Sequence, residues 1–396
     1  MFRSASKNQH IQPFPYRVYV LTALGLALAG LLVSVTLSIS HYRVYTDLTY
    51  RSFCAISKAI NCDTVSESAY SIFWNIPLAV WGAAGYAMFL LLLGFSASRS
   101  EDHQRVWSTC MVLAALFSLF SLLLAGVSTF KIGSYCILCI AMYGINFLLL
   151  YTSWLVRRRF HAGPMRAALV KDLRFLLLNR RLSAPLFALF GAGLLLTHLF
   201  FPAYWQIRMP SASTIVSTGL TDEGHPWIGA ERPALEIVEF SDYQCFQCRK
   251  MHYYLRELVA KYPDKIRLIH RNYPMDHEVN FIVQEPFHVG SGKMALLAIH
   301  AATAGRFWQM NDLLFDLAGN GKDIDLKEVS EKTGLDPHGL AGALQNPAFR
   351  QRLMIDIRTG MKLRVLGTPS YLINSKVYEG NIPAEILAPI IEGAAS

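Results

Sequence analysis

Five long stretches without Asp, Glu, Lys or Arg lie in the first half of this 396-residue chain. Each is long enough to cross a bilayer as a helix, which takes about 20 apolar residues. A buried core helix is the alternative for any one of them, but five with short polar gaps favour a membrane domain. The stretches are roughly Val18–Ser40, Ile76–Ala97, Val106–Phe130, Ile137–Val156 and Leu182–Trp205.

Basic residues between these stretches predict the orientation, because cytoplasmic segments of membrane proteins are enriched in Lys and Arg. With the N-terminus inside, the outer segments before the fifth stretch hold only Arg43, Arg51, Lys58 and Lys131. We therefore expect a cytoplasmic N-terminus and an extracytoplasmic segment after Trp205. The inner segments hold Arg3, Lys7, Arg17, Arg99, Arg105 and eight basic residues between positions 157 and 181.

The net charge of +9 follows largely from that last inner loop. Anionic lipid headgroups account for such a loop, so the charge gives no reason to expect a nucleic-acid partner. Within the loop, we expect Val170–Leu182 to lie on the membrane surface as an amphipathic helix.

Six of the seven cysteines fall in three pairs on the expected outer side, where disulfides persist. A CxxC pair closes too small a ring to stabilise a fold much, whereas the spacing lets one thiolate attack and the other resolve. A structural staple remains an alternative for the first pair, and a zinc site would have to join two distant CxxC segments. Cys110 is expected to pack as a small apolar residue. The pairs are Cys54 with Cys62, Cys136 with Cys139, and Cys245 with Cys248.

The chain becomes polar enough for a soluble domain from about Glu231, after a Ser-, Thr-, Gly- and Pro-rich linker at Pro210–Arg232. A strand at Leu235–Phe240 precedes Cys245, and a helix follows the second cysteine. A cysteine at a helix N-terminus has a lowered pKa, so Cys245 is the expected nucleophile and Cys248 the resolving thiol. Later segments predict a strand at Lys265–Asn272, helices over 293–349, two strands over 366–380 and a last helix at Ala384–Ile391.

This region resembles the thioredoxin-fold disulfide oxidoreductases with a helical insertion, typified by bacterial disulfide-bond protein A. The resemblance rests on Glu-Phe separated by four residues from the CxxC, the helical insert and Gly-Thr-Pro-x-x-x-x-Asn. It implies that Pro369 is a cis-proline, that Thr368 presents its backbone to substrate, and that Glu239 is a buried acid serving Cys248. A trans proline and a solvated glutamate are the alternatives.

One departure concerns the dipeptide between the cysteines, Phe246-Gln247 rather than Pro-His. A histidine there would stabilise the thiolate. Without it the redox poise stays open, from a strong oxidant to an isomerase-like protein.

Residues from about Tyr16 to Val156 resemble the vitamin K epoxide reductase family, a four-helix bundle with two loop cysteines and a CxxC opening its fourth helix. Ser68 stands where that family has a serine, and an aromatic residue, Tyr143, follows the CxxC by one turn. Leu78 replaces an asparagine of the vertebrate branch, which argues against vitamin K epoxide as substrate.

The resemblance implies a relay in which electrons pass from Cys245/Cys248 to Cys54/Cys62, then to Cys136/Cys139, and on to a membrane quinone. Cys54 would accept electrons from Cys245, Cys62 would exchange with Cys136, and the deeper Cys139 would reduce the quinone. Tyr143, Phe73 and Trp74 are candidates for the quinone pocket. Packing in the interfacial aromatic belt is their alternative.

The sequence thus predicts a membrane all-α helical bundle, a four-helix core plus a fifth transmembrane helix, followed by an α/β thioredoxin-like domain with a helical insertion. The expected boundaries are 1–160 for the four-helix domain, 161–206 for the basic loop and fifth helix, 207–232 for the linker and 233–396 for the extracytoplasmic domain.

The expected function is a quinone-coupled thiol-disulfide oxidoreductase of the bacterial inner membrane, with a periplasmic C-terminal domain. It would use ubiquinone or menaquinone and no metal, and make disulfides in exported proteins. A carrier of reducing equivalents outward is a second possibility, although it needs cysteines reachable from both faces. A membrane-tethered isomerase or chaperone, with the membrane part mainly an anchor, is the third.

Overall fold

The computed structural model describes residues 14–50, 52–56, 59–96, 106–160, 162–206, 216–319 and 324–392. It divides into two compact units, Met1–Trp205 and Gln206–Ser396. Several residues used above to predict orientation and the start of the linker lie outside the described residues; they are Arg3, Lys7, Arg51, Lys58, Arg99, Arg105 and residues 207–215.

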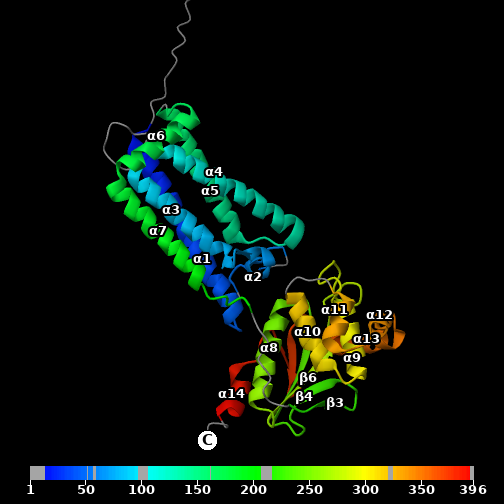
Figure 1. Cartoon of the computed structure of the whole chain (residues 1–396). Coiled ribbons are helices and arrows are strands. Elements are labelled where there is room, and N and C mark those ends of the chain that lie inside the picture. The colour runs from blue at the N-terminus through cyan, green and yellow to red at the C-terminus, as the bar shows by residue number, and fades with distance from the viewer. Residues whose placement is uncertain are drawn as a thin grey trace, which may run out of the picture. The chain divides into compact units, whose positions relative to one another are not determined.

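Among its described residues, the first unit has five helices that are long and apolar enough to cross a membrane, as the sequence predicts (Figure 1). The fifth ends at Phe200 rather than at Trp205, because Phe201 precedes Pro202 and takes an extended conformation. The five spans are α1 (Tyr16–Thr46), α3 (Leu78–Ser96), α4 with the π-helical turn η2 (Trp107–Val127 and Ser128–Ile132), α5 (Ile137–Arg159) and α7 (Arg180–Phe200).

In the core of the bundle, α1 packs against α3 and α5, and α4 packs against α5. Gly30 on α1 makes room for the ring of Tyr86 on α3, since a Cβ there would lie 2.3 Å from that ring. The Tyr86 hydroxyl donates to Oδ1 of Asn146 on α5 at 2.6 Å, and Nδ2 of Asn146 donates to the Ser121 hydroxyl on α4 at 2.9 Å. These buried polar groups therefore satisfy one another and tie three helices together.

Beside the N-terminus of α4, α6 (Met165–Leu178) corresponds to the amphipathic helix expected at Val170–Leu182, but it begins earlier and ends before Asn179. Its Asp172 is buried and accepts hydrogen bonds from the backbone N–H of Val106 at 3.1 Å and of Thr109 at 2.9 Å. Because these donors lie at the N-terminus of α4, a carboxylate from another helix satisfies groups that have no partner within α4. Asp172 thus fixes α6 to the bundle.

The second unit is built on one six-stranded sheet in the order β3-β4-β6-β5-β7-β8, in which only β5 and β6 are parallel. Its strands are β3 (Thr218–Leu220), β4 (Pro226–Gly229), β5 (Leu235–Ser241), β6 (Ile266–Asn272), β7 (Ser370–Ile373) and β8 (Lys376–Glu379).

Helices surround this sheet, and most of them form the expected insertion between β6 and β7 (Figure 1). Phe240 of β5 and Tyr273, which follows β6, pack edge to face with each other, and insertion residues such as Ile357 complete this core. The helices are α8 (Phe246–Lys261), α9 (Ser291–Thr303), α10 (Phe307–Gly319), α11 (Leu326–Thr333), α12 (Pro337–Ala343), α13 (Pro347–Lys362) and α14 (Ala384–Glu392).

The structure differs from the expected linker at 207–232, because β3 and β4 lie within it and extend the sheet. The glycines and prolines there indicate a loop from sequence, but Gly229 has a strand role. Its φ is +116°, and a Cβ would lie 2.0 Å from the carbonyl oxygen of Ile266 on β6. Only glycine allows β4 to approach β6 this closely.

Candidate functional site: three cysteine pairs

Four cysteines of the first unit lie in or beside one buried cluster that includes Leu37 of α1. Cys54 and Cys62 form a disulfide, and Cys136 packs against them with an exposed fraction of only 3%. Cys139 borders the same cluster and is half-buried. Segments that are 74 residues apart in sequence, at Cys62 and Cys136, are therefore in contact, as a disulfide relay requires.

Backbone hydrogen bonds place these cysteines beside one another. Asn61 donates its N–H to the Tyr135 carbonyl at 2.9 Å, and Tyr135 donates to the Ala59 carbonyl at 2.8 Å. The residue that follows each paired segment is a cysteine, Cys62 or Cys136. The Asn61 side chain also caps the short helix α2 (Cys62–Glu67) by accepting from two of its N–H groups. The pairing thus fixes both cysteines without help from their side chains.

Cys136 is the N-cap residue of α5, and its sulfur accepts the backbone N–H of Cys139 at 3.3 Å. The hydrogen bond with the Cys139 thiol lowers the pKa of the Cys136 thiol, although burial opposes this. Cys136 is therefore the member of this pair suited to leave or attack as a thiolate.

The other residues predicted for the membrane site lie at different distances from the cysteines. Tyr143 interacts electrostatically with both CxxC cysteines and hydrogen-bonds to Ser128. Phe73 and Trp74 stack on each other in a small exposed hairpin of β1 (Ile72–Phe73) and β2 (Ile76–Pro77). Ser68 donates to the Val65 carbonyl at 2.7 Å and ends α2. Only Tyr143 is brought to the cysteines by a described interaction.

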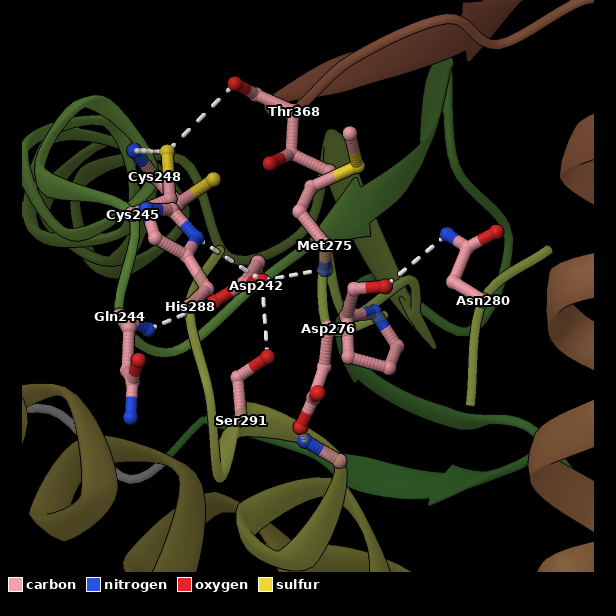
Figure 2. Close-up of polar contacts among 12 residues, drawn as sticks. Asp242, Gln244, Cys245, Cys248, Met275, Asp276, Asn280, His288, Ser291 and Thr368 are labelled. Carbon is pink, nitrogen blue, oxygen red and sulfur yellow. Dashed lines mark hydrogen bonds and ion pairs between the residues drawn. The ribbon is translucent and has the colours of Figure 1, made fainter. Parts of the chain in front are cut away.

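In the second unit, Cys245 is the N-cap of α8 and its sulfur accepts the Cys248 N–H at 3.2 Å (Figure 2). The Cys245 thiol lies 3.4 Å from the carbonyl oxygen of Thr368, to which it donates. The Thr368–Pro369 bond is cis, so the prediction of a cis-proline beside the cysteines is confirmed. The backbone of Thr368 therefore faces the Cys245 thiol.

The two thiols of this pair differ in acidity. Burial alone raises the pKa of Cys245, but the hydrogen bond with Cys248 and the charge of His288 outweigh it, and that pKa falls below its usual value. Burial and the neighbouring Cys245 raise the pKa of Cys248 far above its usual value. The assignment of Cys245 as nucleophile and Cys248 as resolving thiol agrees with this difference.

Glu239 is 1% exposed, so it is the buried acid of the prediction and not a solvated strand residue. The sheet register sets it directly opposite His270 on β6 and Tyr371 on β7. Nδ1 of His270 lies 2.7 Å from Oε1 of Glu239, and Tyr371 interacts electrostatically with Glu239 and Cys248. One row of side chains across the sheet thus leads from His270 through Glu239 to Tyr371, which neighbours Cys248.

Two residues of this site were not predicted from the sequence, Asp242 and His288 (Figure 2). Asp242 accepts hydrogen bonds from the backbone of Gln244 and from the Ser291 hydroxyl, and it lies 3.1 Å from the His288 ring. Its place three residues before the nucleophile could have pointed to it. Nothing in the sequence marks His288, which is 43 residues away from Cys245 and reaches the site only through the fold.

Comparison with known proteins agrees with both halves of this arrangement. Residues 21–154 match the model of the vitamin K epoxide reductase family, and residues 221–393 match a thioredoxin family model. The chain carries a vitamin K epoxide reductase family domain and a thioredoxin-like domain. These are domains of thiol-disulfide oxidoreductases, and the apolar helices make this fusion a membrane protein.

Solved structures similar to the chain cover its thioredoxin-like part. A thioredoxin-like oxidoreductase from Silicibacter pomeroyi is 22% identical and covers 44% of this chain and 94% of its own, with a TM-score of 0.34. BdbD from Bacillus subtilis is 19% identical and covers 46% of this chain and 98% of its own, with a TM-score of 0.35. The thiol-disulfide exchange protein α-DsbA2 from Wolbachia pipientis is 19% identical, covering 43% and 87%, with a TM-score of 0.34.

Among curated proteins, the Na(+)/H(+) antiporters NhaA 3 of Salinispora tropica and NhaA 1 of Salinispora arenicola are each 25% identical over 166 residues. That region is 42% of this chain and 24% of each antiporter. The chain therefore spans about a quarter of the length of these curated relatives.

Proposed function

We propose that the fusion protein oxidises thiols of exported proteins and delivers the electrons to a membrane quinone. The observation that carries this proposal is the buried cluster of Cys54, Cys62, Cys136 and Cys139. A membrane part that served only as an anchor would have no use for two cysteine pairs packed together at one end of the bundle. Their contact is what successive thiol-disulfide exchange needs.

The proposed relay begins when a client thiolate attacks Cys245 of the Cys245–Cys248 disulfide and Cys248 leaves. A second client thiolate then attacks the client sulfur of the mixed disulfide, and Cys245 leaves with the client oxidised. The reduced Cys245 thiolate next attacks Cys54 of the Cys54–Cys62 disulfide, and Cys248 resolves the product. Each exchange moves two electrons and breaks one S–S bond for each one formed.

Within the membrane unit, the thiolate of Cys62 would attack Cys136 of a Cys136–Cys139 disulfide, and Cys139 would leave. Cys54 then attacks Cys62, which restores the loop disulfide and releases Cys136 as a thiol. The net result is a reduced Cys136/Cys139 pair at the head of α5. The paired backbone segments described above keep Cys62 and Cys136 in contact for this step.

The surroundings of Cys139 fit an apolar ring. Aliphatic side chains border the cluster, among them Val33, Ala79 and Met142, and Cys139 is less buried than the other three cysteines. A bound quinone would supply an acceptor for two electrons and two protons. Tyr143, which interacts with both cysteines, is the side chain we propose to hold it, together with Phe73 and Trp74 if the exposed hairpin closes on the site.

We further propose that the N-terminus is cytoplasmic and that the thioredoxin-like domain lies on the periplasmic side of a bacterial inner membrane. Eight basic residues lie between positions 157 and 181, from the end of α5 to the start of α7, and this concentration supports the orientation. A membrane-impermeant maleimide applied to intact spheroplasts should label reduced Cys245. Labelling only after lysis would indicate the opposite orientation.

The decisive experiment is anaerobic quinone reduction by the purified protein in detergent, with a reduced dithiol peptide as donor. We expect quinol to appear with matching loss of peptide thiols, and to be absent with Cys139→Ala. Cys110→Ala is the matched control, because Cys110 is a buried free cysteine on α4 outside the cluster. Peptide exchange at Cys245 without any quinone reduction would instead favour a tethered isomerase or chaperone.

A further inference from the structure

The residues between Cys245 and Cys248, Phe246 and Gln247, carry no charge that could stabilise a thiolate. A histidine nevertheless reaches Cys245 from another part of the domain. His288 precedes α9, and its charge acts on the Cys245 thiol. Figure 2 shows the His288 ring between the cysteine sulfurs and Asp242.

The position of this ring is fixed on two sides. Nδ1 of His288 lies 3.1 Å from Oδ2 of Asp242, and the ring of Phe287 stacks on the imidazole with centroids 4.0 Å apart. The His288 side chain is 20% exposed, so its charge is only partly screened by water.

Asp242 is itself held firmly. Its Oδ1 accepts the backbone N–H of Gln244 at 2.7 Å, and its Oδ2 accepts the Met275 N–H and the Ser291 hydroxyl. The carboxylate is almost fully buried. It joins the segment before the CxxC, the segment after β6 and the start of α9.

Two further contacts fix the backbone that carries His288. Nε2 of Gln244, the residue before the nucleophile, donates to the Val289 carbonyl at 2.9 Å. Oδ2 of Asp276 accepts the N–H groups of Gly290 at 2.8 Å and Gly292 at 3.2 Å. His288, with a φ of +43°, is therefore followed directly by backbone that these side chains hold in place.

We propose that His288, positioned by Asp242, is the cationic partner of the Cys245 thiolate and makes this CxxC pair an oxidant. This inference rests on the proposed function for its direction of electron flow, but not for its test. During client oxidation, Cys245 leaves the mixed disulfide as a thiolate, and a cation beside it makes it a better leaving group. When Cys245 is a neutral thiol, the neutral imidazole can take its proton, which regenerates the thiolate and the cation. Asp242 holds the Nδ1 side of the ring in both states.

Other titratable groups near the thiol act differently. The negative charge of Asp242 by itself raises the pKa of Cys245, so that Asp242 serves as a positioning residue and not as a direct stabiliser. Cys248 on α8 hydrogen-bonds the thiolate, and Tyr371 on β7 is a buried neighbour of both sulfurs. The Asp276–His277 pair lies on the loop before His288, with 3.6 Å between Nδ1 and Oδ1.

The test compares His288→Asn with His288→Arg in the full-length protein. Asparagine removes the charge and tolerates positive φ, whereas arginine keeps the charge. The reduced protein is alkylated with iodoacetamide across a pH series, and modification of the Cys245 peptide is followed by mass spectrometry. His277→Asn, in the same loop and with a side chain 32% exposed, is the control.

We expect His288→Asn to move the midpoint of the alkylation profile upward by about one pH unit, while His288→Arg and His277→Asn stay near wild type. In glutathione buffers, the Asn variant should shift the equilibrium of the pair about tenfold towards the disulfide, which corresponds to about 30 mV. An unchanged profile for His288→Asn, or an equal shift for the Arg variant, would overturn the proposal. Neither readout involves quinone, so failure here leaves the relay intact.

Discussion

Replacing Glu239 by Gln tests whether the buried acid serves the resolving cysteine. Glu239 is 1% exposed, and the neighbour that contacts its carboxylate is Nδ1 of His270 at 2.7 Å. A glutamine keeps the size of the side chain and an oxygen that can accept from His270. The cost in folding free energy should therefore be about 1 kcal/mol, the difference between a charge-assisted and a neutral hydrogen bond.

The effect on the reaction should be much larger than the effect on stability. Burial and the neighbouring thiol raise the pKa of Cys248 far above its usual value, so this cysteine needs a base to become a thiolate. A positioned base contributes about 10²–10⁴-fold to such a proton transfer. We therefore expect the attack of Cys248 on a mixed disulfide at Cys245 to slow at least about 100-fold, or about 2.7 kcal/mol in activation free energy.

The assay isolates that step. Full-length protein with Cys54 and Cys62 replaced by Ala is reduced and mixed rapidly with oxidised glutathione, which forms a mixed disulfide at Cys245. Acid quenching and mass spectrometry then follow release of glutathione as Cys248 closes the disulfide. Glu236→Gln is the matched control, because Glu236 is an exposed residue of the same strand, 3.4 Å from Arg267. Equal release rates for Glu239→Gln and wild type would refute the role of the acid.

Three further predictions concern stability. The Tyr371 hydroxyl is buried without a hydrogen-bond partner among the described residues, so Tyr371→Phe should leave the free energy of unfolding unchanged or raise it by about 1 kcal/mol in denaturant titration; a clear loss would contradict this. Burial lowers the pKa of His225 to about 3, so below pH 6.5 the unfolded chain takes up a proton at this histidine that the folded chain does not. The free energy of unfolding of wild type should therefore fall relative to that of His225→Gln as the pH falls from 6.5 towards 3. A difference between the two proteins that stays constant with pH would contradict this. Asp172→Ala removes the cap of α4 and should cost about 1–3 kcal/mol, seen as a lower Tm in detergent, with little effect on Cys245 alkylation.

Much of this architecture could be predicted from the sequence because it depends on strong local signals. The charge-free runs predict the spans, and the cysteine positions predict which segments belong to the site. The cis bond before Pro369 follows from a motif that extends over several residues. In each case the signal is carried by residues that are close together in the sequence.

The features that the sequence did not predict depend on contacts between distant segments. The sequence predicts a linker where β4 lies, because glycine is typical of loops. Gly229 instead permits the close approach of β4 to β6. The N-terminus of α4 is capped by Asp172, 66 residues after Val106. His288 reaches Cys245 only through a loop fixed by Asp242 and Asp276. No local pattern encodes these distances, since the tertiary fold sets them.

Both CxxC pairs use the same local device to divide the chemistry between two cysteines. In each, the first cysteine is the N-cap of a helix and its sulfur accepts the N–H of the second, at 3.3 Å for Cys136 and 3.2 Å for Cys245. In both pairs the hydrogen bond with the second thiol lowers the pKa of the first, and the backbone N–H of the second cysteine adds to this effect. What differs is the setting beyond it.

Around Cys136 and Cys139 the neighbours are aliphatic side chains and a disulfide, which suit exchange with a loop and with an apolar acceptor. Around Cys245 they are the Thr368 carbonyl beside a cis-proline, and the pair of His288 and Asp242. The helix N-cap therefore makes each pair reactive, while the residues supplied from elsewhere in each fold determine what it reacts with.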